Sequence, residues 1–302
     1  MIPIVHHPAY VAPAPARSQY QWNKNGLVRD LLLAHGERFA WNAPEAMPRK
    51  WLETVHDPDY VAEVLEARVP SAKERRIGFP VTPQVATRAQ MVPGGTWLAA
   101  RLAQRHGFAA NTAGGSHHAL SDTGAGFCVF NDLALAAVRL VEEGDAERVL
   151  IVDCDVHQGD GTAALTAGHA GIATYSIHAE KNFPVRKARS TLDVGLPDGV
   201  DDEGYMAALR DTLLPLIASF APDLVLYQAG VDPLAEDRLG RLSLSREGLA
   251  ARDRWIGATM RARGIPFASA LGGGYGTDPV EVAERHVASI LALGEGAGMR
   301  AG

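Results

Sequence analysis

Three side chains with metal-binding chemistry follow an apolar run in the middle of this chain. Residues 149–152 are Val-Leu-Ile-Val, and Asp153, Asp155 and His157 come directly behind them. Such a run predicts a buried parallel strand, and in extended chain alternate side chains project to the same side. Carboxylates carried toward a core are costly unless a cation or a hydrogen-bonding partner compensates them. The segment therefore predicts a metal site, with helix capping or pairing to Arg as the simpler alternative.

The elements around this segment alternate between strands and helices. Apolar runs predict strands at residues 108–112, 149–153, 172–177, 224–228 and 267–271. Amphipathic patterns predict helices at residues 26–35, 58–67, 96–105, 132–143, 205–220, 246–263 and 280–293. This alternation is typical of a parallel α/β sheet. We therefore expect a three-layer αβα fold with a central, mostly parallel sheet, as one domain over residues 1–302 with a flexible tail at 294–302.

Polar or glycine-rich sequence follows each of the five predicted strands, where ligands bind in open parallel sheets. Asp232 follows the fourth strand, although taken alone it could be a helix cap. Together with Asp155 and His157 it forms the simplest metal triad, which leaves a coordination position for water and substrate. Oxygen and nitrogen ligands without a thiolate fit Zn²⁺, and also Fe²⁺, Co²⁺ or Mn²⁺.

Two adjacent histidines and a tyrosine could supply proton chemistry at the same edge. His117 and His118 follow the first strand, and a neutral imidazole can take a proton from water near neutral pH. Asp153 and Asp160 are the obvious carboxylate partners, one for each ring. Tyr275 lies in the glycine-rich loop after the last strand, where it could donate to a developing oxyanion. We expect the glycines to give it mobility or access; a His-His pair in a surface turn is the alternative for the histidines.

Composition excludes several classes of function. The net charge of −6 argues against extensive, sequence-independent binding to nucleic acid phosphates. The one basic cluster, Lys181, Arg186, Lys187 and Arg189, is interpreted as a solvated loop. No segment is apolar enough to span a bilayer and no signal-peptide pattern opens the chain, which predicts a cytoplasmic protein without a membrane partner. The two cysteines, Cys128 and Cys154, are expected to be buried, reduced thiols.

Jointly, the motifs resemble those of the zinc-dependent histone deacetylase superfamily, which has an arginase-like α/β fold. The resemblance covers nearly the whole chain. It is carried by residues 56–61 (HDPDYV), 114–119 (GGSHHA), 126–128 (GFC), 153–162 (DCDVHQGDGT), 228–232 (QAGVD) and 272–275 (GGGY). Residues 157–160 (HQGD) and 181–184 (KNFP) are most similar to a bacterial branch related to class IV deacetylases.

The resemblance implies two metal sites. Asp155, His157 and Asp232 would bind Zn²⁺, which is the set that the residues themselves suggest. A structural K⁺ is implied as well, which the residues alone do not predict. Its ligands would be carboxylate or carbonyl groups of Asp153, Asp155, His157, Ser176 and Ile177.

Catalytic roles are also implied by the resemblance. His118 would be the main general base and acid, and His117 would assist electrostatically. Asp160 would orient His118, Asp153 would orient His117, and Tyr275 would stabilise the oxyanion.

The implied reaction is hydrolysis of an Nε-acyl-lysine amide, in a peptide or protein, by metal-activated water. The Gly126 carbonyl would accept the substrate amide N–H, while Phe127 and Phe183 would flank the acyl-lysine stem. From the residues alone, the two phenylalanines could wall an apolar channel or belong to the core. Neither the length of the acyl group nor the oligomeric state can be predicted.

Three other functions remain as alternatives. The first is an amidohydrolase for acetylated polyamines or other small acylated amines, with residues 1–25 as a segment that could narrow the entrance. The second is a ureohydrolase like arginase, which the single-metal pattern with Tyr275 disfavours. The third is a non-catalytic acyl-lysine binding protein, against which the intact metal, base and tyrosine positions argue.

Overall fold

The fold is built around one parallel sheet. The computed structural model describes residues 1–13, 20–36 and 38–299. The strands lie in the order β2-β1-β3-β8-β7-β4-β5-β6, and each neighbouring pair is parallel. Their bounds are β1 Ile2–Val5, β2 Phe39–Asn42, β3 Phe108–Asn111, β4 Val149–Asp153, β5 Ile172–Ala179, β6 Leu192–Leu196, β7 Leu224–Gln228 and β8 Phe267–Ala270.

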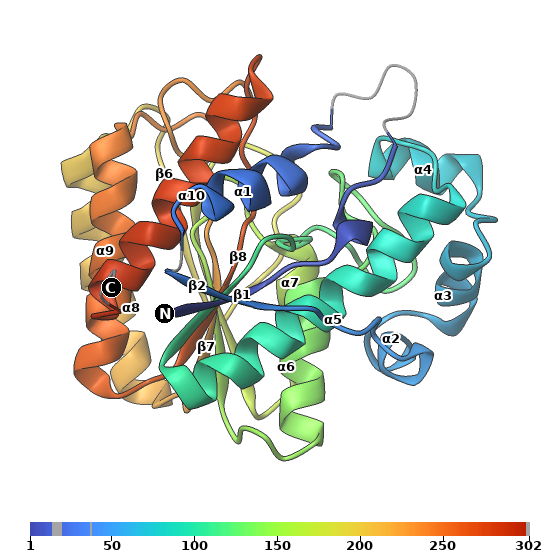
Figure 1. The fold of residues 1–302 in the computed structure, drawn as a ribbon, viewed down its shortest axis with the longest axis horizontal. Coiled ribbons are helices and arrows are strands. Elements are labelled where there is room, and N and C mark those ends of the chain that lie inside the picture. Colours follow the sequence, from blue (N-terminus) through green and yellow to red (C-terminus); the bar gives the residue numbers. More distant parts are fainter. Residues whose placement is uncertain (14–19, 37, 300–302) are drawn as a thin grey trace.

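Helices cover both faces of this sheet and make the three layers that the sequence predicts (Figure 1). Helices α1, α8, α9 and α10 lie on one face, and α5 and α6 lie on the other, with α2 against α6 and α3 against α5. The bounds are α1 Lys24–Leu33, α2 Arg49–Val55, α3 Pro58–Leu65, α4 Ser71–Ile77, α5 Pro83–His106, α6 Asp132–Glu142, α7 Asp160–Leu165, α8 Asp202–Phe220, α9 Arg246–Arg263 and α10 Pro279–Gly296. A short 3-10 helix spans Pro8–Tyr10.

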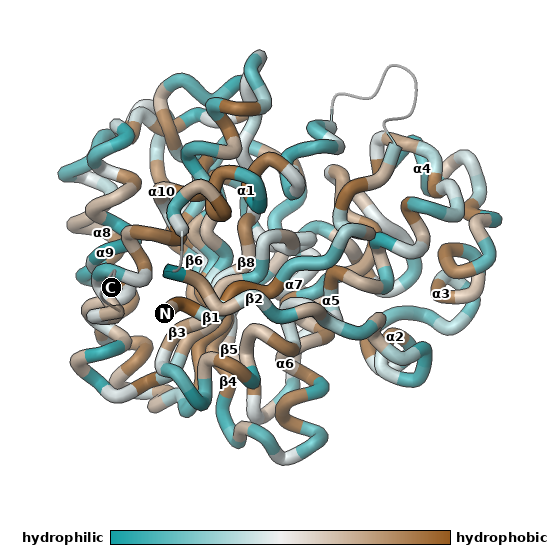
Figure 2. Tube along the Cα trace, in the orientation of Figure 1, coloured by the Kyte–Doolittle hydropathy of each residue, from teal (hydrophilic) through white to brown (hydrophobic). Residues whose placement is uncertain are grey.

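Each face of the sheet has its own apolar core. In β4, Leu150 and Val152 pack with the residues of α8, α9 and α10, whereas Val149 and Ile151 pack with those of α5 and α6. Successive side chains of a strand point to opposite faces, so a strand covered on both sides needs apolar residues throughout. Figure 2 shows this apolar centre, with hydrophilic residues concentrated on the outer loops.

Predicted and observed elements agree best for the long or fully buried ones. The ranges 149–153, 224–228 and 246–263 coincide with β4, β7 and α9, and most other predicted elements differ by a few residues at their ends. The strands β1, β2 and β6 and the short helices α2, α4 and α7 are not predicted from the sequence. Their four to seven residues give too few repeats of either period to be recognised.

Helix α5 is much longer than the helix predicted at 96–105. It begins at Pro83 and passes through Pro93-Gly94-Gly95, a sequence that usually ends a helix. A Cβ atom on Gly94 would collide with the carbonyl oxygen of Glu45. The glycines therefore permit close packing of the helix on a neighbouring segment, and this tertiary contact overrides the local signal.

The flexible tail predicted at 294–302 is wrong for the part that the structure describes. Helix α10 continues to Gly296, and the amide of Met299 donates to the carbonyl of Gly294 at 2.9 Å. A Cβ atom on Gly294 would collide with the side chain of Ile2 in β1. The helix end is therefore packed on the sheet; residues 300–302 lie outside the described residues.

The structure bears on two predictions made from composition, one about the two cysteines and one about membrane-spanning segments. Cys128 and Cys154 are buried and unpaired, as predicted. Among the described residues, no helix combines the length and the apolar character that crossing a bilayer requires. The cytoplasmic location stays a prediction.

Candidate metal centre and catalytic site

The three proposed metal ligands meet in one buried cluster at the carboxyl edge of the sheet. Asp155 and His157 follow β4, and Asp232 follows the neighbouring strand β7. Their ligand atoms lie within 4.8 Å of one another. His157 Nδ1 is 3.0 Å from Asp155 Oδ1 and 3.2 Å from Asp232 Oδ2. Two carboxylates and one imidazole form a donor set that suits a divalent cation with an open coordination position.

The cluster has features that a cation would satisfy. Asp232 Oδ2 is buried and accepts no hydrogen bond of good geometry from the described residues; its contact there is the ion pair with His157 Nδ1 at 3.2 Å, which compensates a buried carboxylate oxygen poorly. Burial and the nearby Asp155 carboxylate raise the pKa of Asp232 to about 7. Burial lowers the pKa of His157, but the two carboxylates outweigh it and raise that pKa to about 10. The residues present therefore fit a bound cation, whose charge would balance the two acids.

The backbone that carries the ligands is held by a buried arginine. Cys154 and Val156 pack in the core under α8 to α10, so the intervening Asp155 is turned away from that core, as the alternation predicts. Arg252 in α9 donates from Nη1 to the carbonyl oxygens of Cys154 (3.1 Å) and Gly230 (2.9 Å). The sequence analysis misses this arginine, because a charged residue within a predicted helix usually indicates a solvated face.

His117 and His118 each pair with a carboxylate. His117 Nδ1 lies 2.7 Å from Asp153 Oδ2, and His118 Nδ1 lies 2.7 Å from Asp160 Oδ1. The centroids of the two rings are 4.0 Å apart. Because Nδ1 of each ring faces its carboxylate, Nε2 is left for the cavity; that of His117 lies 3.8 Å from Asp155 Oδ1.

The two histidines differ in charge. Burial lowers the pKa of His117, but the carboxylates of Asp153 and Asp155 raise it to about 9. Burial and the neighbouring His117 lower the pKa of His118 to about 3, and Asp160 offsets only part of this. At neutral pH the first ring therefore carries a positive charge, and the second is a neutral proton acceptor.

A buried aspartate fixes the turn that precedes these histidines. Asp132, the first residue of α6, accepts hydrogen bonds from the amides of Gly115 (3.2 Å) and Ser116 (2.7 Å). It also accepts one from Thr96 Oγ1 at 2.7 Å. Gly114 has a left-handed backbone (φ 93°), and a Cβ atom there would collide with this carboxylate. The sequence analysis misses Asp132, whose place at a helix start indicates only a cap.

Glycines let two loops approach the metal ligands. A Cβ atom on Gly115 would meet the backbone of Gly272, and one on Gly273 would collide with Asp232 Oδ2. The amide of Gly273 donates to Asp155 Oδ2 at 2.6 Å. The glycines of the last loop therefore serve close approach, which differs from the mobility or access expected from the sequence.

Tyr275 lines the same cavity as the histidines and Asp155. Its ring centroid is 6.4 Å from that of His157, and its amide donates to Asp237 Oδ2 at 2.6 Å. Burial and the carboxylates of Asp155 and Asp232 raise the pKa of Tyr275 well above its ordinary value. The phenol is therefore a stable hydrogen-bond donor. Asp237, another residue that the sequence analysis misses, positions it.

Gly126 and Phe127 line the cavity, and Phe183 lies beside it against His118. Phe183 is 41% exposed, and the centroid of its ring is 4.7 Å from that of His118. Phe127 has a left-handed backbone (φ 67°), which is unusual for an aromatic residue and is often found at functional sites. The Gly126 carbonyl accepts a weak hydrogen bond from Cys128 Sγ at 3.4 Å. Phe183 therefore belongs to the opening and not to the core.

A buried lysine, Lys24, lines the cavity. Lys24 Nζ donates to the carbonyl of Gly272 at 3.0 Å, and burial lowers the pKa of this lysine to about 8. The cavity itself is small, with a volume of ≈ 30 Å³. The sequence analysis misses Lys24 as well, since lysines are rarely buried.

Of the residues implied for K⁺, Asp153 lies in β4, Asp155 and His157 follow it, and Ser176 and Ile177 lie in the neighbouring strand β5. Asp153 is paired with Ser176 across the two strands, and Ile177 is the next residue of β5. The amide of Asp155 donates to Asp153 Oδ1 at 3.0 Å, which bends the segment back on the strand end. Ser176 Oγ lies 3.0 Å from His178 Nδ1. K⁺ binding itself stays a prediction.

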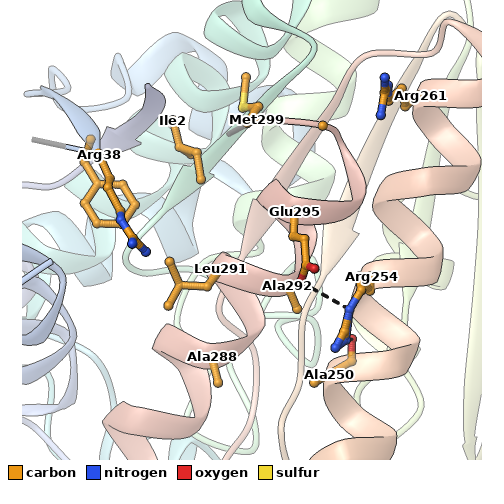
Figure 3. Close-up of a pocket in the computed structure, with 12 residues that line it drawn as sticks. Ile2, Arg38, Ala250, Arg254, Arg261, Ala288, Leu291, Ala292, Glu295 and Met299 are labelled. Carbon is orange, nitrogen blue, oxygen red and sulfur yellow. Dashed lines mark hydrogen bonds and ion pairs between the residues drawn. The ribbon is translucent and has the colours of Figure 1, made fainter. Parts of the chain in front are cut away.

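A second hollow lies far from this cluster, between α9 and α10 (Figure 3). This α9–α10 groove has a volume of ≈ 650 Å³, and its lining includes Ile2, Arg38, Arg261, Ala288 and Leu291. Arg38 directly precedes β2, so this part of the groove lies at the amino ends of the strands, whereas the metal cluster lies at the carboxyl ends. None of the predicted site residues lines it.

The family model of the histone deacetylase domain matches residues 15–291. The chain belongs to the histone deacetylase family. An uncharacterized protein of Picosynechococcus sp. is 44% identical over 94% of this chain and 95% of its own length. Histone deacetylase 2 of Arabidopsis thaliana is 34% identical over 60% of this chain and 48% of its own length. The chain thus spans about half the length of that named deacetylase.

Solved structures support the fold of this family member. An acetylpolyamine aminohydrolase of Burkholderia pseudomallei superposes with a TM-score of 0.79 and 21% identity, over 97% of this chain and 99% of the other. The HD domain of HDA15 gives a TM-score of 0.81 with 21% identity, over 96% and 88%. At this identity the likeness establishes the three-layer α/β architecture of the deacetylase fold.

Proposed function

We propose that this histone deacetylase family member is a metal-dependent amidohydrolase that removes an acyl group, acetyl or longer, from Nε-acyl-lysine. The observation that carries the proposal is the convergence of a buried Asp-His-Asp cluster, a carboxylate-held imidazole and a phenol at one cavity. Amide hydrolysis needs a polarised carbonyl, a base for water and a donor to the oxyanion. Deacetylase-type hydrolysis is also the activity for which the family is named.

The metal would be held by Asp155, His157 and Asp232, as Zn²⁺ or as Fe²⁺ or another divalent ion. When bound, it would polarise the acyl carbonyl and lower the pKa of water. We further propose K⁺ at the set Asp153, Asp155, His157, Ser176 and Ile177. The resemblance to class IV deacetylases also stays a proposal.

His118 would take the proton from the attacking water. Its ring is neutral, and the Asp160 carboxylate holds Nδ1 so that Nε2 is the accepting atom. His117, positively charged beside Asp153, would stabilise the negative charge that develops during attack. His118 would then return the proton to the departing lysine amine, giving a free carboxylate and lysine.

Tyr275 would donate a hydrogen bond to the tetrahedral oxyanion, since its phenol stays protonated. The Gly126 carbonyl would accept the substrate amide N–H. Phe127 and Phe183 would contact the two sides of the aliphatic lysine stem as it passes through the opening.

The test is a panel of acetyl-lysine and longer acyl-lysine peptides, with release of the carboxylate as the readout. We expect turnover that is abolished by a chelator and restored by added Zn²⁺ or Fe²⁺. Turnover that survives verified removal of the metal would contradict the proposal.

A small acylated amine is the second candidate substrate. The likeness in fold to the acetylpolyamine aminohydrolase of Burkholderia pseudomallei covers nearly all of both chains. The same catalytic groups would serve either substrate, because the scissile amide is the same. An acetylated polyamine therefore belongs in the same panel.

A further inference from the structure

Segments that border the cavity carry four exposed cations, Arg76, Lys181, Arg186 and Arg238, which we call the cationic rim. Two of these residues are joined to site residues through the backbone. The carbonyl of Arg76 accepts from the amide of Gly126 at 3.1 Å, and the amide of Arg238 donates to the carbonyl of Tyr275 at 3.3 Å. Lys181 and Arg186 lie within three residues of Phe183 in the chain. Part of the basic cluster interpreted above as a solvated loop thus borders the opening.

All four side chains of the cationic rim are exposed, and none has an ion-pair partner among residues 1–13, 20–36 and 38–299. Four exposed acids lie in the same or neighbouring segments, Asp122, Glu180, Glu236 and Asp278. Glu236 is occupied by ion pairs with Arg246 (3.5 Å) and Arg285 (3.4 Å). Asp278 caps α10 by accepting from the amide of Val280. The loop that carries Arg238 also contains a buried acid, Asp237, whose carboxylate is occupied by three backbone amides.

Exposed apolar side chains lie in the same two loops as Lys181, Arg186 and Arg238. Phe183 is 41% exposed, Val185 is 99% exposed and Leu239 is 39% exposed. Asn182 Nδ2 donates to the carbonyl of Leu239 at 2.8 Å, which joins the two loops that carry these residues. Lys187 is not part of the rim, because its ammonium donates to the carbonyls of Asn182 and Pro184.

We propose, on the basis of the proposed function, that the rim selects acyl-lysine within an acidic polypeptide segment and disfavours acylated polyamines. Unpaired cations around an opening attract acidic residues that flank the acylated lysine, and they repel the ammonium groups of a polyamine. Exposed apolar residues add a surface for a flanking aliphatic or aromatic side chain. A peptide can place acidic side chains against the cations and an apolar side chain against the exposed apolar residues at the same time. A polyamine carries positive charge and has no such side chains.

The experiment compares one acyl-lysine peptide with Asp, Gln or Lys at the flanking positions, together with an acetylated polyamine. We expect kcat/KM to be about 10-fold higher for the Asp peptide than for the Lys peptide at low salt, and this ratio to shrink at high salt because exposed charges are screened. The acetylated polyamine should be a poorer substrate than the Gln peptide.

A charge-reversal variant and a matched control locate the effect. In Arg186→Glu/Arg238→Glu the order of the Asp and Lys peptides should invert. Arg38→Glu/Arg261→Glu changes the net charge equally but in the α9–α10 groove (Figure 3), and it should leave the wild-type order unchanged. Inversion by both variants would trace the preference to net charge and overturn the role of the rim.

The outcomes separate this inference from the proposed function. Equal kcat/KM for the three peptides, or a higher value for the acetylated polyamine, would overturn the rim proposal while amide hydrolysis stands. Absence of hydrolysis for every substrate, with the metal bound, would overturn both. If the charge-reversal variant does not fold, the order of kcat/KM for the three peptides with the wild-type protein, and its dependence on salt, still test the rim proposal.

Discussion

The metal cavity and the α9–α10 groove are two hollows with opposite properties. The groove is far larger, at ≈ 650 Å³ against ≈ 30 Å³. Its ion pair, Arg254 with Glu295, is 44% and 69% exposed (Figure 3), whereas the side chains of His117, His118 and Asp155 in the cavity are at most 5% exposed. Charges in a site without solvent act on one another strongly, and exposed charges are screened. Buried, convergent charge, and not the size of a hollow, therefore identifies the proposed reaction site.

The largest effect is expected for a metal ligand. Asp232→Asn removes one negative charge from the cluster, and we expect it to lower both the metal content and turnover by more than about 100-fold, since losing even an outer-shell partner costs about 10–100-fold. Metal content is measured by mass spectrometry after dialysis.

The matched control for this variant is Glu295→Gln, the same loss of charge in the α9–α10 groove. It should keep wild-type metal content and turnover. Loss of metal in both variants would mean that net charge, and not the cluster, holds the ion.

The next effect is expected for the proposed base. His118→Ala removes the acceptor for the water proton but no metal ligand, so turnover should fall about 10²–10⁴-fold while metal content stays near that of the wild type. Near-wild-type turnover in the purified, metal-loaded variant would remove His118 from the mechanism.

A somewhat smaller effect is expected for the phenol. Tyr275→Phe keeps the ring contacts with Phe127 and His157 and deletes only the hydroxyl. Turnover should fall about 10²–10³-fold, which is the usual cost of one oxyanion donor. KM should change little; a large rise in KM with unchanged kcat would instead indicate a role in substrate binding.

The sequence predicts which proposed reacting groups come together better than it predicts the groups that hold them in place. The Asp155 and His157 positions follow from the alternation of an extended chain, and Asp232 follows from the rule that parallel strands end at a common edge. The alternation is a local property of the sequence, and the common edge depends only on the fold class. The same reasoning predicts the three layers and the positions of β4 and β7.

The supporting groups depend on contacts between distant parts of the chain. Arg252 lies on a helix that looks solvated, yet its guanidinium reaches the carbonyls of Cys154 and Gly230. Asp132 and Asp237 hold backbone amides of loops that no local pattern associates with them. Their function exists only once the loops are in place, which is why period and propensity do not predict them.

A moderate effect on stability is expected at His56, which supports the site without touching the cavity. Its Nδ1 lies 2.9 Å from the carbonyl of Leu120, and its Nε2 accepts from the amide of Asn131 at 3.0 Å. Because both partners are backbone groups of loops beside His117 and His118, the proposed catalytic histidines, His56→Gln should lower the free energy of unfolding by about 1–3 kcal/mol at neutral pH.

The pH dependence gives a second measurement at His56. Burial lowers the pKa of this residue from 6.5 to about 4. The unfolded state therefore binds more protons between those values, and stability falls as pH decreases through that window, by up to about 3 kcal/mol. Urea unfolding at several pH values should show the difference between wild type and His56→Gln shrinking toward pH 4. A constant difference would show that the ring does not stay neutral in the folded protein.

The smallest effect is expected in the α9–α10 groove. Ala288 is exposed on α10, and Ala288→Leu would fill part of the groove with apolar atoms. Since the charged residues that line the groove, Arg38, Arg254, Arg261 and Glu295, are all exposed, kcat/KM should stay within about twofold of wild type and the free energy of unfolding within about 0.5 kcal/mol. Steady-state kinetics and urea unfolding are the measurements. A tenfold loss of kcat/KM with unchanged stability would show that the groove is coupled to the metal cavity through α9, whose Arg252 holds the ligand backbone, and the contrast between the two hollows would then be wrong.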